Sequence, residues 1–110
     1  MDAAVTESEF NDLVDETLEV LETALDEVDE ELDYQNAGGI LTLEFENGST
    51  MVFSRQPPTK ELWLASRSGG FHFVYDQVQA DWRDTRSEVY FRPFVVAQML
   101  EHAGIAFDWG

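Results

Sequence analysis

The N-terminal third of the chain repeats apolar residues at the spacing of an amphipathic helix. Thr6 and Glu9 form a capping-box pattern at its start. Val5 and Phe10 occupy the two positions of a hydrophobic staple. No glycine or proline interrupts the segment after Phe10, so the pattern predicts a helix over about residues 6–29. Its apolar stripe consists of Phe10, Leu13, Val14, Thr17, Leu21, Ala24, Leu25 and Val28.

The middle of the chain changes to the two-residue alternation that is typical of strands. Turn-forming residues separate the alternating runs, among them Gly38-Gly39, Pro57-Pro58 and Ser68-Gly69-Gly70. This spacing predicts an antiparallel meander. The predicted strands cover residues 32–37, 40–46, 49–55, 61–66 and 71–75, with a further short strand around Trp82.

The hairpin at Asn47-Gly48 has a register that the hydrophobic pattern decides. A two-residue loop would pair Leu43 with Val52 and mix the two faces of the sheet. A three-residue loop with Gly48 as the left-handed bulge residue pairs Leu43 with Met51 and keeps both faces intact. We therefore expect the three-residue loop.

The C-terminal third contains a second helical signal. Residues 84–87 are typical of a polar turn. Pro93 suits the first turn of a helix that runs to about His102, with Gly104 just past its end. Residues 88–91 are compatible with a strand or a helix. The order helix, strands, helix predicts an α+β sandwich with two helices packed on one face of an antiparallel sheet.

The composition indicates a single folded domain over residues 1–110. Hydrophobic residues make up 44% of the chain and aromatic residues 13%, which argues against disorder. The lack of cysteine excludes disulfides, thiolate nucleophiles and cysteine-ligated metal centres. The longest apolar run, residues 94–97, is too short to span a membrane, and the N-terminus has no signal- or transit-peptide pattern. We expect a cytoplasmic protein, or a matrix protein already trimmed.

Charge is distributed very unevenly along the chain. Residues 1–54 contain sixteen carboxylates and no Lys or Arg, whereas residues 55–110 contain seven acids and six bases. The formal net charge of -17 therefore divides into -16 and -1. Such a one-sign field attracts cations and basic protein surfaces, and it repels nucleic acid and anionic lipid. We expect neither a nucleic-acid partner nor a membrane partner.

A line of carboxylates along the first helix is the main candidate site. Asp15, Glu19, Glu22 and Asp26 are spaced four, three and four residues apart, so they share one helix face. Oxygen ligands of this kind select hard cations such as Ca²⁺, Mg²⁺, Mn²⁺, Fe²⁺ and Fe³⁺. The predicted acidic ridge comprises Asp15, Glu19, Glu22, Asp26, Glu27, Asp29, Glu30, Glu31 and Asp33.

The same line could be an ordinary solvated helix face. Natural exposed helices gain stability from Glu–Lys pairs four residues apart, and this helix has like-charge pairs instead, such as Asp15/Glu19 and Glu22/Asp26. Each such pair destabilises the helix by ~0.2–0.5 kcal/mol. A chain that retains this destabilisation is more consistent with a functional row of carboxylates than with an ordinary solvated face. Because an exposed row of carboxylates does not enclose an ion, we expect weak, labile cation binding. No EF-hand loop and no Glu-x-x-His pair appears.

Trp63 is the second candidate, with a core position as the alternative. Its neighbours Leu62 and Leu64 occupy the buried face of the predicted strand, which places Trp63 on the solvent face. An exposed tryptophan near Arg55 and Gln56 is a suitable anchor for a protein partner.

Neither histidine indicates a metal site or a catalytic site. His72 lies between Phe71 and Phe73 and should face solvent, and His102 suits the C-terminal end of a helix dipole. The sequence shows no serine–histidine–acid arrangement, phosphate loop or dinucleotide fingerprint.

An ordered set of short motifs resembles the frataxin family, in particular its bacterial (CyaY-type) form. The resemblance covers nearly the whole chain and implies the α+β sandwich, an acidic ridge on the first helix and first strand, and weak iron binding. It also implies a role in iron–sulfur cluster assembly, through docking on the cysteine desulfurase and scaffold complex. The motifs are Ser8-Glu9-Phe10, Gly38-Gly39-Ile40-Leu41-Thr42, Phe45-Glu46-Asn47-Gly48-Ser49, Arg55-Gln56-Pro57-Pro58, Leu62-Trp63-Leu64-Ala65, Gly69-Gly70-Phe71-His72-Phe73 and Asp84-Thr85-Arg86.

Three functions compete on the sequence alone. The leading hypothesis is a monomeric, non-enzymatic, iron-binding regulator of cluster assembly that docks through Arg55, Gln56, Trp63 and the acidic ridge. The alternative is a ferroxidase or iron chaperone that oxidises or delivers Fe²⁺ at the ridge. The third is an acidic decoy that mimics nucleic acid for a basic protein. A decoy needs acidic residues at phosphate spacing over a large surface, whereas the excess acidic residues of this chain are confined to its first half.

Overall fold

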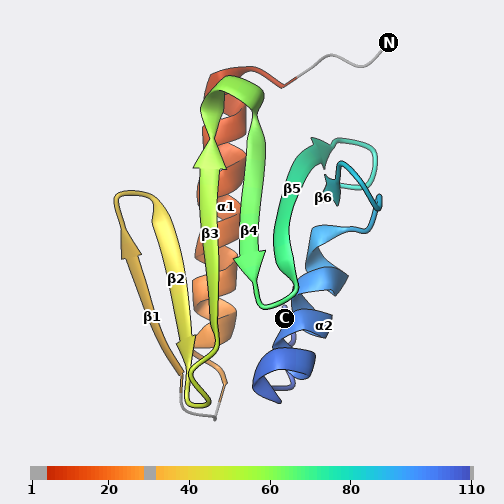
Figure 1. The fold of residues 1–110 in the computed structure, drawn as a ribbon. Coiled ribbons are helices and arrows are strands. Elements are labelled where there is room, and N and C mark those ends of the chain that lie inside the picture. The colour runs from red at the N-terminus through yellow and green to blue at the C-terminus, as the bar shows by residue number, and fades with distance from the viewer. Residues whose placement is uncertain (1–4, 29–31, 110) are drawn as a thin grey trace.

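The computed structural model describes residues 5–28 and 32–109. Within these residues, the helices α1 (Glu7–Leu25) and α2 (Phe91–Ala103) lie on the same side of a six-stranded antiparallel sheet (Figure 1). The strands are β1 (Leu32–Ala37), β2 (Ile40–Phe45), β3 (Thr50–Gln56), β4 (Glu61–Ser66), β5 (Gly69–Asp76) and β6 (Asp81–Asp84), in the same order in the sheet as in the chain. The predicted α+β sandwich is confirmed.

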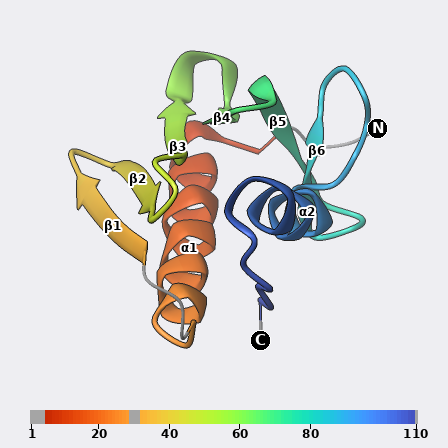
Figure 2. The ribbon, with the colours of Figure 1, turned by 60° about the horizontal axis from the view of Figure 1, so that its bottom comes forward.

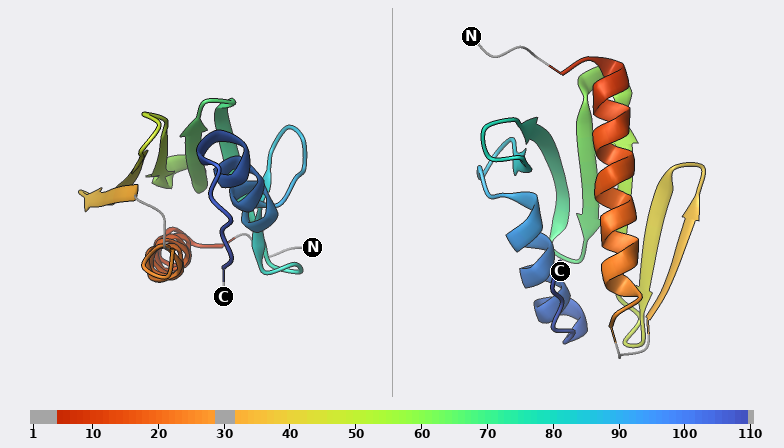
Figure 3. Two further views of the ribbon diagram at one scale, coloured as in Figure 1. Left: turned by 90° about the horizontal axis from the view of Figure 1, so that it is seen from below. Right: turned by 180° about the vertical axis from the view of Figure 1, so that it is seen from behind.

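The two layers leave one face of the sheet uncovered by the described helices. In Figure 3 the helices form one layer and the strands the other. Figure 2 shows the C-terminal segment passing between α1 and α2. The buried side chains of the strands face the helices and form the core. Neither helix in the described part of the chain is both long enough and apolar enough to cross a membrane.

Helix α1 begins where the sequence predicts and ends earlier. The Thr6 hydroxyl accepts the backbone N–H of Glu9 over 3.1 Å, and the Glu9 carboxylate accepts the N–H of Thr6 over 2.9 Å, so the capping box is present. The helix stops at Leu25, four residues short of the predicted end. Its last turn has no basic residue, and carboxylates there oppose the helix dipole. Leu18, which the predicted stripe omitted, is buried.

The β2–β3 hairpin has the predicted register. Leu43 lies opposite Met51. Gly48 has a φ of 87°, and its N–H donates to the carbonyl oxygen of Phe45 over 2.9 Å. A residue with a side chain would be strained at that φ, which explains the glycine. The loop is also anchored at a distance, because the Asn47 amide donates to the carbonyl oxygen of His102 over 2.6 Å.

One boundary differs from the sequence prediction, and the structure sets another that the sequence left undecided. The loop before β5 is shorter than expected, because Ser66 pairs with Gly69 and both glycines there belong to the strand. Helix α2 begins at Phe91, two residues before Pro93, with Tyr90 as its N-cap. Segment 88–91 is thus neither a strand nor wholly helical.

A carboxylate from the sheet supports the early start of α2. The carboxylate of Asp81, on β6, accepts the N–H of Arg92 over 3.2 Å and so satisfies a donor in the first turn of the helix. The Phe91 ring packs edge-on against Phe53 and Phe73 in the core. Both contacts come from distant strands, and local sequence therefore could not place this boundary.

Candidate functional site

The predicted acidic ridge follows the side of α1 that faces β1 and β3. Asp15, Glu19 and Asp26 are exposed, and Glu22 is half-buried. Three of these four carboxylates accept a hydrogen bond from a strand. The donors are Arg55 to Asp15, Asn36 to Glu22 and Tyr34 to Asp26.

Arg55 belongs to the acidic ridge rather than to the surface around Trp63. Its Nη2 donates to Oδ1 of Asp15 over 2.6 Å, and its Nη1 donates to the side-chain oxygen of Asn11 over 3.2 Å. In the β3–β4 register Arg55 lies opposite the buried Leu62, whereas Trp63 lies opposite Ser54. Because neighbouring residues of a strand point to opposite faces, Arg55 and Trp63 are on different sides of the sheet. The structure does not bring these two predicted contact residues together.

Strand β1 supplies neutral donors to the C-terminal half of the ridge. The Tyr34 hydroxyl donates to Oδ1 of Asp26 over 2.7 Å, and the Asn36 amide donates to Oε2 of Glu22 over 3.2 Å. The bond to Asp26 raises the pKa of the Tyr34 phenol, since it favours the protonated form and a phenolate would be repelled. The donors fix these two carboxylates, which remain at the surface where a cation can reach them.

Two other ridge residues face a groove beside the C-terminal segment. Glu19 and Glu27 line a groove of about 530 Å³ between α1 and the chain near Trp109. Val20 and Ala24 contribute to the same groove. The predicted line of carboxylates is thus divided. Glu22 and Asp26 are bonded to β1, whereas Glu19 and Glu27 face the groove beside the C-terminal segment.

The end of the predicted ridge does not continue on the same face. Asp33 lies directly opposite Glu44 in the β1–β2 pair, on the face of β1 that points away from Tyr34. Asp29, Glu30 and Glu31 lie outside the described residues. The sequence analysis did not include Glu44 and Glu46 among the site residues. The pairing of β1 with β2, which places Asp33 opposite Glu44, could have indicated Glu44.

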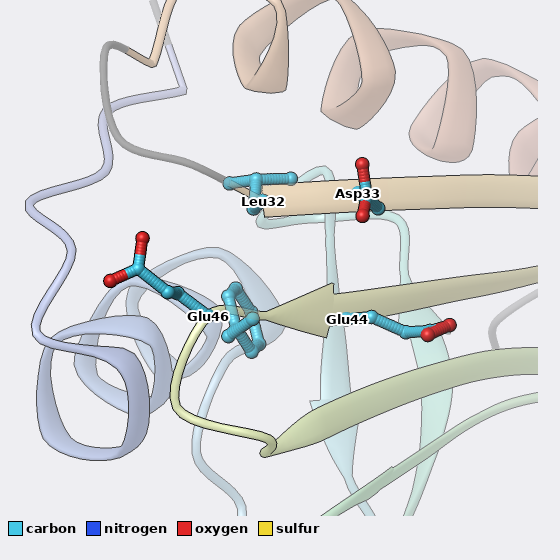
Figure 4. Close-up of a pocket in the computed structure, with 5 residues that line it drawn as sticks. Leu32, Asp33, Glu44 and Glu46 are labelled. Atoms are coloured by element: carbon cyan, nitrogen blue, oxygen red, sulfur yellow. The ribbon is translucent and has the colours of Figure 1, made fainter.

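Asp33, Glu44 and Glu46 line a depression of about 410 Å³ on the outer part of the sheet. Figure 4 shows their carboxylates pointing in different directions rather than toward one point. Over residues 5–28 and 32–109, no three His, Asp or Glu side chains are grouped so that they could hold a metal ion. The arrangement suits weak association with hydrated hard cations, because it offers oxygen ligands at the surface without enclosing an ion.

Trp63 lies on the open face of the sheet and is half-buried. Its indole N–H donates to Oε1 of Glu61 over 2.8 Å. Its ring stacks on the imidazole of His72, with 4.2 Å between centroids and 6° between planes. Gln56 lies opposite Glu61 in the β3–β4 pair and so shares this face. Of the predicted contact residues, Trp63 and Gln56 thus form one surface.

The second histidine stabilises the other end of the molecule. His102 lies in the last turn of α2, as predicted. Its Nε2 is 2.7 Å from the hydroxyl of Ser68, in the β4–β5 loop, and the two form a hydrogen bond. This contact holds the end of the helix against the sheet.

Comparison with known proteins gives one consistent match. A family model described as a Frataxin-like domain matches residues 3–104. A Pseudomonas fluorescens (strain Pf0-1) protein named "Iron-sulfur cluster assembly protein CyaY" is 43% identical over 106 residues, 96% of each chain. The protein of that name from Pseudomonas aeruginosa PAO1 is 44% identical over 100 residues, 91% of this chain and 93% of the relative.

Two solved structures have the same fold. Frataxin from Psychromonas ingrahamii superposes with a TM-score of 0.88 at 32% identity, covering 96% of this chain and 99% of that chain. Trimeric frataxin from Saccharomyces cerevisiae, complexed with ferrous iron, superposes with a TM-score of 0.66 at 27% identity. That comparison covers 94% of this chain and 91% of the yeast chain.

Proposed function

The chain belongs to the frataxin family, and we propose that it is an iron-binding accessory protein of iron–sulfur cluster assembly. Its Pseudomonas relatives are named for that role. On this chain, the observation that carries the proposal is the exposed row of carboxylates on α1, a helix without a single Lys or Arg. The like-charge repulsion within that row destabilises the helix, which favours a functional reason for keeping it.

In this proposal iron is a labile cargo of the ridge. Carboxylate oxygens suit Fe²⁺, Fe³⁺ and other hard divalent cations. An ion on the convex surface of a helix keeps much of its water, so it binds weakly and exchanges quickly. The residues proposed to hold it are Asp15, Glu19, Glu22, Asp26 and Glu27, continued by Asp29, Glu30, Glu31 and Asp33.

We further propose that the protein docks on the complex of the cysteine desulfurase and its scaffold protein. The acidic field supports a basic partner surface, because opposite charges accelerate encounter. Trp63 and Gln56 offer a contact on the open face of the sheet, whereas the ridge lies on the helical layer. A partner that uses both must therefore pass around the β1–β2 edge. Arg55 contributes to the ridge part of this surface through Asp15.

The ferroxidase alternative has less support from the geometry. Such an enzyme needs ligands that stay around the iron while its charge changes. The described His, Asp and Glu side chains include no grouping of three that could do so. The relatives are named as assembly proteins rather than as catalysts, and we propose a non-enzymatic role in the bacterial cytoplasm.

The proposal is tested by capture of the purified desulfurase–scaffold complex on immobilised protein, with and without Fe²⁺ under anaerobic conditions. The wild-type chain should retain the complex, and Glu22→Lys combined with Glu19→Lys should retain much less. Glu88→Lys combined with Glu101→Lys is the matched control, since it makes the same change in net charge at two exposed positions outside the proposed surface. Equal capture by the wild type and the double variant would overturn the docking role of the ridge.

A further inference from the structure

Trp63 is held at two points by its neighbours on the open face of the sheet. Its N–H donates to the carboxylate of Glu61, two residues earlier on β4, over 2.8 Å. Its ring stacks on His72, which lies directly opposite on β5. An unsupported tryptophan on a strand can occupy several rotamers. Two contacts in different directions select one orientation of the indole.

The carboxylate also approaches the second aromatic ring. Oε1 of Glu61 is 3.7 Å from Nδ1 of His72, so Glu61, Trp63 and His72 form one connected set, here called the indole frame. The side chains of Glu61 and His72 are 20% and 43% exposed. The indole frame is therefore a surface arrangement, and core packing alone does not account for it.

We infer that Glu61 and His72 are positioning residues that hold Trp63 ready for its partner. This inference rests on the proposed docking role of Trp63. A side chain already held in its bound orientation loses less conformational freedom on binding. Loss of either contact should therefore weaken docking roughly two- to tenfold while the protein stays folded.

The indole frame also limits what the partner can present to Trp63. The N–H of the indole is already bonded to Glu61, and one face of the ring is covered by His72. Beside the ring is a shallow hollow of about 100 Å³, to which Val52 and Ala65 contribute. The group that fits is a small aliphatic side chain, which packs in the hollow against the ring. A hydrogen-bond acceptor directed at the indole does not fit.

The first part of the test uses the free protein and needs no partner. The N–H signal of Trp63 is assigned by its loss in Trp63→Phe, and its exchange with solvent is measured by NMR. Exchange should be slow in the wild type and in Glu61→Gln, whose amide oxygen can still accept the bond, and faster in Glu61→Ala. The nuclear Overhauser contacts between the indole and residue 72 should persist in His72→Phe and vanish in His72→Ser. Exchange rates and contacts that are the same in all variants would overturn the indole frame.

The second part measures affinity for the desulfurase–scaffold complex. Glu61→Ala and His72→Ser should weaken binding roughly two- to tenfold, and the matched variants Glu61→Gln and His72→Phe should stay near the wild-type value. Equal weakening by Glu61→Ala and Glu61→Gln would assign the effect to charge and overturn the positioning role. If Trp63→Ala leaves binding unchanged, the docking role of Trp63 is wrong, and with it the purpose of the indole frame, whatever the NMR results.

Discussion

The guanidinium of Arg55 is bonded to the carboxylate of Asp15, with 2.6 Å between Nη2 and Oδ1. The first basic residue of the chain thus reaches across from the sheet to the acidic helix. Because Arg55 also donates to Asn11, one side chain holds two turns of α1 against β3. It also neutralises one end of the acidic ridge, which leaves the excess charge farther along the helix.

Replacement of Arg55 by alanine should destabilise the protein by about 1–2 kcal/mol, because it removes two hydrogen bonds and leaves Asp15 without its cation. Urea unfolding measures the change. Arg83→Ala is the matched control, since Arg83 is 3.9 Å from Glu88 at an exposed site and should cost much less. Equal losses in the two variants would contradict the role of Arg55 as a tie between helix and sheet.

Replacement of Glu19 by lysine should stabilise the protein by about 1 kcal/mol, because it turns repulsion from Asp15, Glu16 and Glu22 into attraction. Glu19 is the suitable position, since the strands in the described part of the chain supply no donor to it, whereas Asp26→Lys would break the bond from Tyr34. Added salt should raise the wild-type melting temperature by screening the same repulsion. A melting temperature that stays flat from low to high salt would argue against the account.

Paramagnetic cations should affect one side of the molecule. Mn²⁺ or anaerobic Fe²⁺ should broaden the NMR signals of Glu19, Glu22 and Asp26 first, and the side-chain amide of Asn36 should follow because it is bonded to Glu22. The chemical shifts of the core should hardly change, since surface binding requires no rearrangement. Broadening centred on His72 or on α2 would contradict a site on the ridge.

The capping box should make part of the stability depend on pH. The N–H of Thr6 donates to Glu9 and holds the pKa of that carboxyl below its ordinary value of 4.5. A carboxyl whose pKa is lower in the folded state contributes stability above its unfolded pKa and loses it as the pH falls through the folded pKa. The stability difference between the wild type and Glu9→Gln, which keeps the cap without titrating, should therefore shift against the wild type below pH 4.5. Urea unfolding at a series of pH values measures the difference, and a constant one would contradict this role of Glu9.

Two tryptophans should respond oppositely to truncation. Trp63→Ala should leave the fold intact and speed dissociation of the partner, at a cost to binding of about 2 kcal/mol if Trp63 is a hot spot. Trp82→Ala should destabilise the fold by about 3–5 kcal/mol, because Trp82 is buried against Phe10 and its N–H bonds to Thr17. Surface plasmon resonance and urea unfolding separate the two effects. Unfolding by Trp63→Ala would place that residue in the core.

The sequence patterns that predicted the fold correctly were local or periodic. The capping box at Thr6 involves groups three residues apart, and the hairpin register follows from keeping Leu43 and Met51 on one face. Local patterns placed Pro93 in the first turn of α2 and did not decide the exact start of the helix, because its support, the carboxylate of Asp81, comes from another strand. No local pattern contains that information.

In the candidate site, too, local patterns were predicted correctly and contacts from distant strands were not. The carboxylates of α1 were visible in the sequence, but their donors Tyr34 and Asn36 became apparent only once β1 lay beside the helix. The face on which Arg55 lies could have been predicted from the sequence. Arg55 follows Met51 and Phe53 at two-residue spacing in β3, so it points to the same side of the sheet as these buried residues. Applying the alternation to the end of that strand would have separated Arg55 from Trp63.

The strand order has a consequence for how the chain reaches this structure. Since every strand pairs with its neighbour in the chain, the sheet can form hairpin by hairpin, and each step closes only a short loop. We expect the helix contacts that close the longest loops to form last, among them Thr17 with Trp82 and Asn47 with His102. Changes at those two contacts should act mainly on the unfolding rate, because contacts made late are still absent in the transition state.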